Sequence, residues 1–289
     1  MKNIIIAILV LSATNIAFAG GPWPQPKGKA YIKLSEWWTI FDEHYTDNGG
    51  IDPNLTSGIF NTTVYVEYGL TDRLTTVINA PIFSRSIMNT QRSGTTNDII
   101  VPGEGLNSVG DIDLALKYAL TKLGSNIPVA VSLTLGVPTG NSSAGQFGSL
   151  QTGDGEFNQY LKIDAGKSFQ IGSTPSYFSI YAGVNNRTKD FSEEFRTGAE
   201  LGVGLGKGKF WLAGKANVIQ SFNNGGNAIS ANTTGIFANN SESVILGLDA
   251  NYYITDKFGI SAGYADIING EIIAAAPSYS VGIFLDLAK

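Results

Sequence analysis

The sequence predicts an all-β protein, a single up-and-down antiparallel transmembrane β-barrel of about 12 strands. Segments of about ten residues alternate between apolar and polar side chains, which is the period of a strand. Short and long connections take turns along the chain, as periplasmic turns and external loops do in outer-membrane barrels. Charged residues make up only 15% of the chain, against about 25% in soluble proteins, which suits a surface that faces lipid.

The alternation is clearest in residues 111–118, DIDLALKY. The isoleucine, leucines and tyrosine of this segment share one face, because successive side chains of a strand point to opposite sides. Its two aspartates, alanine and lysine share the other face. Patterns of this kind predict strands at 29–41, 59–70, 73–85, 109–121, 127–137, 157–168, 177–187, 195–206, 209–221, 242–254, 257–268 and 276–287.

The connections between these strands sort by length. Residues 70–73, 206–209 and 254–257 form tight turns, and 122–126 and 170–175 are slightly longer ones. The other connections are long and polar, and they are predicted at 42–57, 86–107, 141–156 and 223–240. A soluble sandwich has no reason to sort its connections in this way, so the ordering favours a membrane barrel.

The N-terminus predicts export. Residues 1–19 have a basic start, a short apolar run and an Ala17-Phe18-Ala19 cleavage site, which together are typical of a secretory signal peptide. The apolar run is shorter than the roughly 20 residues of a membrane helix. Residues 20–28 are then a Pro-rich periplasmic lead-in, and 29–289 form one outer-membrane barrel. The predicted location is therefore the cell outer membrane, with cleavage after Ala19.

Composition excludes several classes of function. The chain has no cysteine, which excludes a lipoprotein anchor, disulfides, thiol catalysis and cysteine metal sites. Its net charge is −5 without a basic run, which argues against nucleic acid as a partner. The expected partners are outer-membrane lipids, the barrel-assembly machinery and a small organic solute, and no cofactor is expected.

Charged side chains on the inner face of the strands are expected to pair with one another, since an unpaired buried charge is costly. An alternative use of Asp111 and Asp113, about 7 Å apart on one strand face, is to bind Ca²⁺ together with Asp154 and Glu156. The pairing requirement favours a lumen charge network without a metal. Its predicted members are Lys33, Glu67, Asp111, Asp113, Lys117, Lys162, Asp164, Arg196, Glu200, Lys215, Asp249 and Asp286.

Aromatic residues gather near the predicted strand ends, where membrane barrels carry interfacial girdles. Trp37 and Trp38 are adjacent, so only one of them can face lipid. Alternation with Lys33 and Ser35 places Trp37 inside. Trp37 and Tyr160 are therefore candidates for stacking on a ligand.

The last strand carries part of a barrel-assembly signal. Such signals have the form polar-x-Gly-x-x-apolar-x-apolar, which Ser280, Gly282, Leu285 and Leu287 fit. The usual terminal aromatic residue is missing, and Ala288-Lys289 follow. The match is partial.

Catalysis has one candidate residue. His44, the single histidine, follows Asp42 and Glu43, and a histidine oriented by a carboxylate can activate a serine or a water. No nucleophile is tied to it by spacing, so the chain is predicted not to be an enzyme. A hydrolase at the barrel rim stays open as a third hypothesis.

Three short motifs follow one another in the first half of the chain. They are Gly110-Asp111-Ile112-Asp113 with Lys117-Tyr118, Gly136-Val137-Pro138-Thr139-Gly140, and Gln151-Thr152-Gly153-Asp154-Gly155. In order and spacing they resemble the outer-membrane β-barrel family of phenol meta-pathway degradation and transporter proteins, over about residues 60–170. The resemblance implies a barrel that takes up small organic molecules, since some members are encoded near genes for the degradation of aromatic compounds.

The predicted strand number bounds the function. A barrel of about 12 strands is wider than the small barrels that side chains fill and narrower than the 16–18-stranded porins. A restricted channel for passive uptake of small organic solutes, aromatic or hydrophobic, is the first hypothesis. The alternative is a structural or surface-interaction barrel without transport, whose function lies in its long external loops.

Overall fold

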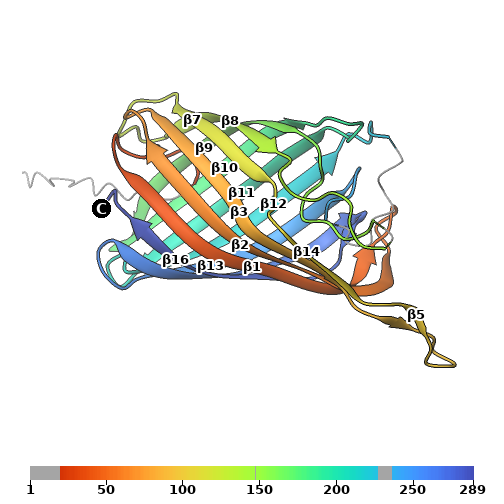
Figure 1. The fold of residues 1–289 in the computed structure, drawn as a ribbon. Helices are drawn as coiled ribbons and strands as arrows, with labels where there is room; N and C mark the ends of the chain where they lie inside the picture. Colours follow the sequence, from red (N-terminus) through yellow and green to blue (C-terminus); the bar gives the residue numbers. More distant parts are fainter. Residues whose placement is uncertain (1–19, 147, 227–235) are drawn as a thin grey trace, which may run out of the picture.

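The chain closes into a barrel. The computed structural model describes residues 20–146, 148–226 and 236–289, and the predicted signal peptide lies outside them. β1 (Ala30–Tyr45) pairs with β2 (Ile51–Gly69) on one side and with β16 (Ser278–Asp286) on the other, which closes the sheet into the cylinder of Figure 1. The predicted all-β antiparallel barrel is confirmed.

The main sheet has 14 strands, of which β6 and β15 are short additions, so 12 strands run around the barrel. Each of the 12 overlaps one of the predicted strands. Besides β1, β2 and β16 they are β3 (Leu74–Met88), β7 (Ile112–Ala119), β8 (Val129–Val137), β9 (Asn158–Ile171), β10 (Thr174–Asn186), β11 (Glu194–Leu205), β12 (Phe210–Ser221), β13 (Glu242–Tyr253) and β14 (Phe258–Glu271).

The predicted long connection at residues 42–57 is wrong. β1 continues to Tyr45 and β2 starts at Ile51, so a tight turn joins them. The two strands stay paired here, with a register shift between Phe41 and Glu43. A strand that extends beyond the lipid needs polar side chains on both faces, and this erases the period-2 alternation by which a strand is predicted.

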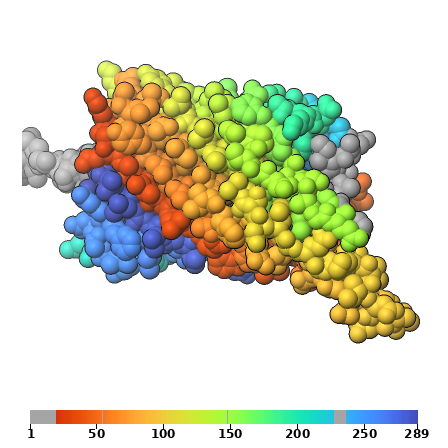
Figure 2. Space-filling model, in the orientation of Figure 1, coloured from red at the N-terminus to blue at the C-terminus, as the bar shows by residue number. Residues whose placement is uncertain are grey.

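The connection predicted at 86–107 also contains strands. β4 (Gln91–Arg92) pairs with β5 (Ile99–Val101), and β6 (Glu104–Ser108) pairs with β3. The β4–β5 ribbon projects from the end of the barrel opposite to the C-terminus (Figure 1), and Figure 2 shows it standing clear of the main body. The small strand β15 (Ile273–Ala274) extends the pairing of β1 at the same end.

The outer face of the barrel is apolar, as the alternation predicts. Along β7, Leu114, Leu116 and Tyr118 are 43%, 53% and 43% exposed, whereas Lys117 is 5% exposed on the inner face. Trp38 stacks on Tyr279 outside the barrel at 5.8 Å between ring centroids. Among the residues that the structure describes, no helix is long and apolar enough to cross a membrane.

Two of the tight turns use the same chemistry. In the turn between β2 and β3, the Thr71 hydroxyl accepts hydrogen bonds from the backbone amides of Arg73 and Leu74. In the turn between β13 and β14, Thr255 does the same for Lys257 and Phe258. A threonine that caps its own turn favours a short connection.

Candidate functional site

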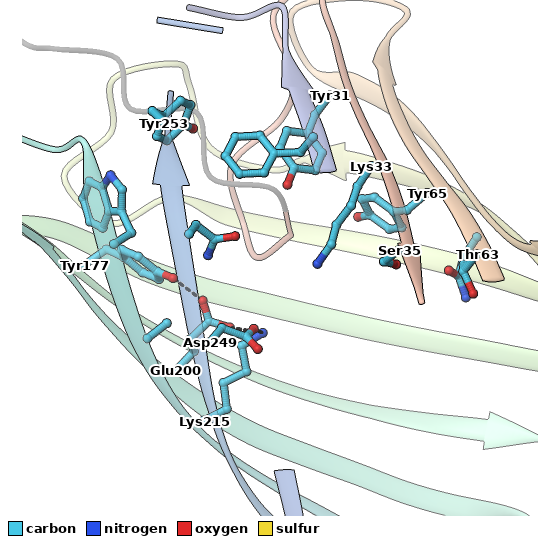
Figure 3. Close-up of a pocket in the computed structure, with 15 residues that line it drawn as sticks. Tyr31, Lys33, Ser35, Thr63, Tyr65, Tyr177, Glu200, Lys215, Asp249 and Tyr253 are labelled. Atoms are coloured by element: carbon cyan, nitrogen blue, oxygen red, sulfur yellow. Dashed lines mark hydrogen bonds and ion pairs between the residues drawn. The ribbon is translucent and has the colours of Figure 1, made fainter. Parts of the chain in front are cut away.

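The lumen contains a cavity of about 320 Å³ whose wall comes from both halves of the chain. Figure 3 shows tyrosine rings around it, with the charged ends of Lys33 and Lys215 pointing inward. Trp211 and Phe284 add to its aromatic wall. The cavity therefore combines large apolar faces with a few charged groups, which is the usual make-up of a small-molecule site.

Each of three tyrosines at this level donates its hydroxyl to a carboxylate. Tyr65 donates to Glu67 and Tyr177 donates to Glu200. Tyr253 donates to Asp286 over 3.0 Å. These bonds fix the rings as well as the charges, and Tyr253 packs edge-on against Phe284 at 4.9 Å between centroids. The wall of the cavity is therefore held in place and is not free to collapse.

Lys215 joins three neighbouring strands. Its ammonium lies 3.5 Å from Glu200 of β11 and also forms an ion pair with Asp249 of β13. Lys33 forms no ion pair with any residue that the structure describes, although it points into the same cavity (Figure 3). Gly282 gives it room, because a Cβ there would lie 3.1 Å from Lys33 Cε.

The lead-in folds into the end of the barrel where the β2–β3 turn lies. Gln25 is 1% exposed. Its backbone amide donates to the Thr75 hydroxyl over 2.9 Å, and its side-chain amide donates to the Glu67 carboxylate over 3.1 Å. Trp23 packs edge-on against Tyr177 at 5.7 Å between centroids. Residues predicted only to precede the barrel thus narrow its lumen.

Glu67 is the centre of this arrangement. It is fully buried and accepts a hydrogen bond from the backbone nitrogen of Gly20 over 2.7 Å. Lys117 lies 3.5 Å from the same carboxylate and donates to the Gly21 carbonyl over 3.4 Å. The carboxylate and the lysine together hold the start of the lead-in.

The remaining predicted lumen charges make separate contacts. Lys162 pairs with Asp164 at 3.0 Å. Asp113 accepts a bond from Asn79 over 3.4 Å. Arg196 binds Glu194, a residue that the sequence analysis did not single out.

Asp111 does not join the lumen pairs. Its carboxylate accepts hydrogen bonds from the backbone amides of Gly140 over 2.8 Å and Asp154 over 3.0 Å. Thr139 adds a bond to the Gly110 carbonyl over 2.6 Å. The three motifs of the family resemblance therefore meet at one site, where their hydrogen bonds hold the connection after β8 against the start of β7.

Two glycines make this contact possible. A Cβ at Gly140 would lie 2.7 Å from the Thr152 carbonyl oxygen, and a Cβ at Gly153 would collide with the Asp111 carboxylate. Gly153→Ala is therefore expected to lower the free energy of unfolding by roughly 1–3 kcal/mol through overpacking, measured by urea unfolding of the refolded barrel. Gly94→Ala is the control, since a Cβ at Gly94 meets nothing within 4 Å. Equal effects of the two substitutions would contradict this role for Gly153.

Asp111 makes this contact sensitive to pH. Burial raises the pKa of its carboxyl from 3.8 to about 6, and the neighbouring Asp154 carboxylate acts in the same direction. The folded state thus holds a proton that the unfolded chain has lost between these values. This contribution to stability is complete below pH 3.8 and is lost as the pH rises through about 6.

We therefore compare the urea midpoint of the native chain with that of Asp111→Asn at each pH. The native midpoint minus the variant midpoint is expected to decrease as the pH is raised from 4 to 7. The asparagine side chain lacks the ionising group but keeps the size of the aspartate. Burial raises the pKa of Glu156 as well, and that contribution is common to both chains and cancels in the difference. A difference that is independent of pH would sink this prediction.

Arg187 is the main residue that sequence reasoning missed. Its guanidinium, 5% exposed, lies 3.2 Å from Asp154, 3.0 Å from Glu156 and 2.6 Å from Glu194. Of the acids considered for Ca²⁺, Asp154 and Glu156 are thus bound by this arginine. Asp111 is bound by backbone amides, and Asp113 by the Asn79 side chain. Among the residues described, no group of three or more histidine, aspartate or glutamate side chains is arranged to hold a metal.

The other candidate residues lie apart from the cavity. Tyr160 packs under Arg196, 5.3 Å from ring centroid to Cζ, with its hydroxyl buried and unbonded. Trp37 is on the inner face of β1 but does not line the cavity. His44 lies within β1 opposite Asp52, and its Nδ1 is buried without a hydrogen-bond partner.

The assembly-signal residues belong to the closing strand. Ser280, Gly282 and Leu285 lie on β16, and Leu287 follows it. Ser280 pairs in register with Trp37 of β1, and Leu285 is 37% exposed on the outer face.

No protein-family model matches the sequence, and no curated protein does. Among solved structures the chain is similar to the COG4313 outer membrane channel from Pseudomonas putida F1, at 16% identity and a TM-score of 0.57, over 93% of this chain and 99% of that one. It is also similar to the transport unit of the autotransporter AIDA-I from Escherichia coli, at 8% identity and a TM-score of 0.51, over 90% of each chain. These likenesses show the fold of an outer-membrane β-barrel.

Proposed function

We propose that the chain is an outer-membrane channel for the passive uptake of small organic solutes, and that it reaches this membrane after cleavage behind Ala19. The observation that carries the proposal is the cavity of about 320 Å³ inside a barrel whose outer face is apolar. A closed barrel in lipid has all its strand edges paired, so the lumen is its route for a solute.

The lining of the cavity supports aromatic or hydrophobic solutes. Six of its fifteen lining residues are tyrosine, tryptophan or phenylalanine, and rings bind rings by offset or edge-on contact. The resemblance to the phenol meta-pathway family supports the same class. The charges of Lys33, Lys215 and Asp249 add polar selectivity at the level of these rings.

The chemistry proposed for the lumen is binding and passage without catalysis, a cofactor or a metal. Glu67 is bound to Tyr65, Lys117 and the lead-in, and Lys215 is bound to Glu200 and Asp249. His44 has the residues Asp52 and Ala274 as its strand neighbours.

A surface-interaction barrel is the second candidate, and one observation favours it. The projecting β4–β5 ribbon exposes Ile99 and Ile100 at 56% and 58%. Exposed apolar side chains on a projecting element are typical of contact surfaces. In such a barrel the function lies outside the lumen.

Single-channel conductance of the refolded protein in a planar bilayer, with phenol or benzoate added, tests the channel. We expect discrete current steps that the solute blocks. Lys33→Gln should shift the reversal potential in a salt gradient toward cation selectivity, because it removes an inward positive charge. Lys207→Gln, the same change in an exposed turn, should not. Protein that is inserted but silent would refute the open channel and leave the surface-interaction barrel.

A further inference from the structure

We propose that the amino group of Gly20, once cleavage behind Ala19 has freed it, forms a buried ion pair with Glu67 that locks the lead-in inside the barrel. The inference rests on the export step of the proposed function and deepens it. Cleavage then does more than remove the signal peptide, because it creates the charged group that pairs with Glu67 in the folded lumen.

The geometry points to this pair. The Gly20 nitrogen lies 2.7 Å from Glu67 Oε1, within charge-assisted hydrogen-bond distance. The carboxylate is fully buried, so water does not compete for it. Gln25 and Lys117 approach its other oxygen, Oε2, at 3.1 and 3.5 Å. Glu67 is therefore already arranged to receive positive charge and hydrogen-bond donors from the lead-in and from β7.

Cleavage changes what this nitrogen can do. Water adds to the Ala19 carbonyl carbon, the bond from that carbon to the Gly20 nitrogen breaks, Ala19 leaves as a carboxylate and Gly20 becomes an amine. The amine is protonated at neutral pH, since its ordinary pKa is about 7.7–8.0. A neutral amide donor thus becomes an ammonium, and hydrogen bonds to charged groups are roughly twice as strong as neutral ones.

The existing cation does not make this ammonium redundant. Lys117 divides its ammonium between Glu67 at 3.5 Å and the Gly21 carbonyl at 3.4 Å. A buried ion pair is favourable only when its geometry is good and further hydrogen bonds complete it. The Gly20 nitrogen has the shorter distance to the carboxylate, and Tyr65 and Gln25 complete the shell.

The position of the cut then matters to a single residue. One extra residue before Gly20 would move the charge by up to about 3.5 Å along the chain. The Gly20 nitrogen would still donate its hydrogen bond as an amide, but the charge would lie elsewhere. An extended chain therefore tests the ammonium alone, because it moves the charge away from Glu67 and keeps the hydrogen bond from the Gly20 nitrogen.

The test measures how fast an α-amine-selective aldehyde labels the purified folded protein, with mass spectrometry to read the N-terminus and the site of labelling. We expect a chain that starts at Gly20 and is labelled about tenfold more slowly than the denatured chain, because the ion pair raises the pKa of the amine and only the unprotonated amine reacts. A chain with Ala-Ser inserted between Ala19 and Gly20 should be labelled at close to the denatured rate. Glu67→Gln should accelerate labelling of the native chain but not of the extended one.

Three results would overturn the proposal: a start at another residue, labelling of the native chain at the denatured rate, or equal rates for native and Glu67→Gln chains. If Glu67→Gln shows no heat-modifiable mobility and so has not folded, the native and extended chains, which both keep Glu67, still decide. A protected Gly20 in a silent barrel would refute the channel and leave the ion pair. A reactive Gly20 in a conducting barrel would refute the ion pair and leave the channel.

Discussion

Deletion of residues 20–26 is expected to raise the single-channel conductance of the refolded barrel several-fold, the largest change that a deletion of this size should produce. The deleted segment carries Trp23 and Gln25, which lie against Tyr177 and Glu67 inside the lumen. With the segment gone, the narrowest part of the pore should be set by the tyrosine wall. The measurement is current per channel at fixed voltage and salt.

The matched control for this experiment is deletion of residues 94–97, which lie in the projecting ribbon away from the lumen. It should leave the current per channel unchanged. Trp23→Ala should give an intermediate increase, because it removes the largest ring of the lead-in and keeps the contacts of Glu67. If both deletions conduct as the native chain does, the lead-in does not restrict the pore.

Arg187→Met is expected to destabilise the barrel by about 3–5 kcal/mol, the usual cost of removing one partner from a buried ion pair. Three carboxylates depend on this guanidinium, and Glu156 among them is 1% exposed. The substitution also removes the contact of Arg187 with the Phe191 ring at 4.4 Å. Urea unfolding of the refolded protein at neutral pH measures the loss.

Two further variants sharpen this prediction. Arg92→Met makes the same change at an exposed position on the ribbon and should alter stability by less than about 0.5 kcal/mol. Arg187→Lys keeps the charge but lacks the planar fork that reaches several carboxylates at once. It should therefore restore only part of the stability. A stable Arg187→Met protein would show that the three acids find other partners or take up protons.

The barrel was predictable because lipid imposes one rule on every strand. Within the membrane the outer side chains must be apolar, so residues such as Leu114 and Leu116 alternate with Asp113 and Lys117. Outside the lipid the rule ends. The upper parts of β1 and β2 are polar on both faces and were therefore predicted as a loop, although their backbones stay paired to Tyr45 and Ile51.

The site was predictable only in its inward charges. Lys215 and Glu200 lie on neighbouring strands, so alternation alone brings them to one face. Arg187 lies beyond the last alternating residue of β10, and its acids come from the connection before β9 and from the first residue of β11. No local pattern shows that these segments meet. The place of the Pro-rich lead-in inside the lumen likewise depends on contacts with residues far away in the sequence, which no local pattern shows.

The ion pairs around Lys215 bear on how the cylinder forms. Glu200 and Asp249 together carry one more charge than Lys215 can balance, and all three come from the consecutive strands β11, β12 and β13. The cation that faces this excess is Lys33, which lines the same cavity and interacts electrostatically with Asp249. Lys33 belongs to β1, and it arrives only when β1 pairs with β16. A sheet whose last seam is open therefore lacks this cation beside the excess negative charge. Closing the seam brings Lys33 to the same cavity, which favours the complete barrel over assembly intermediates with a free edge.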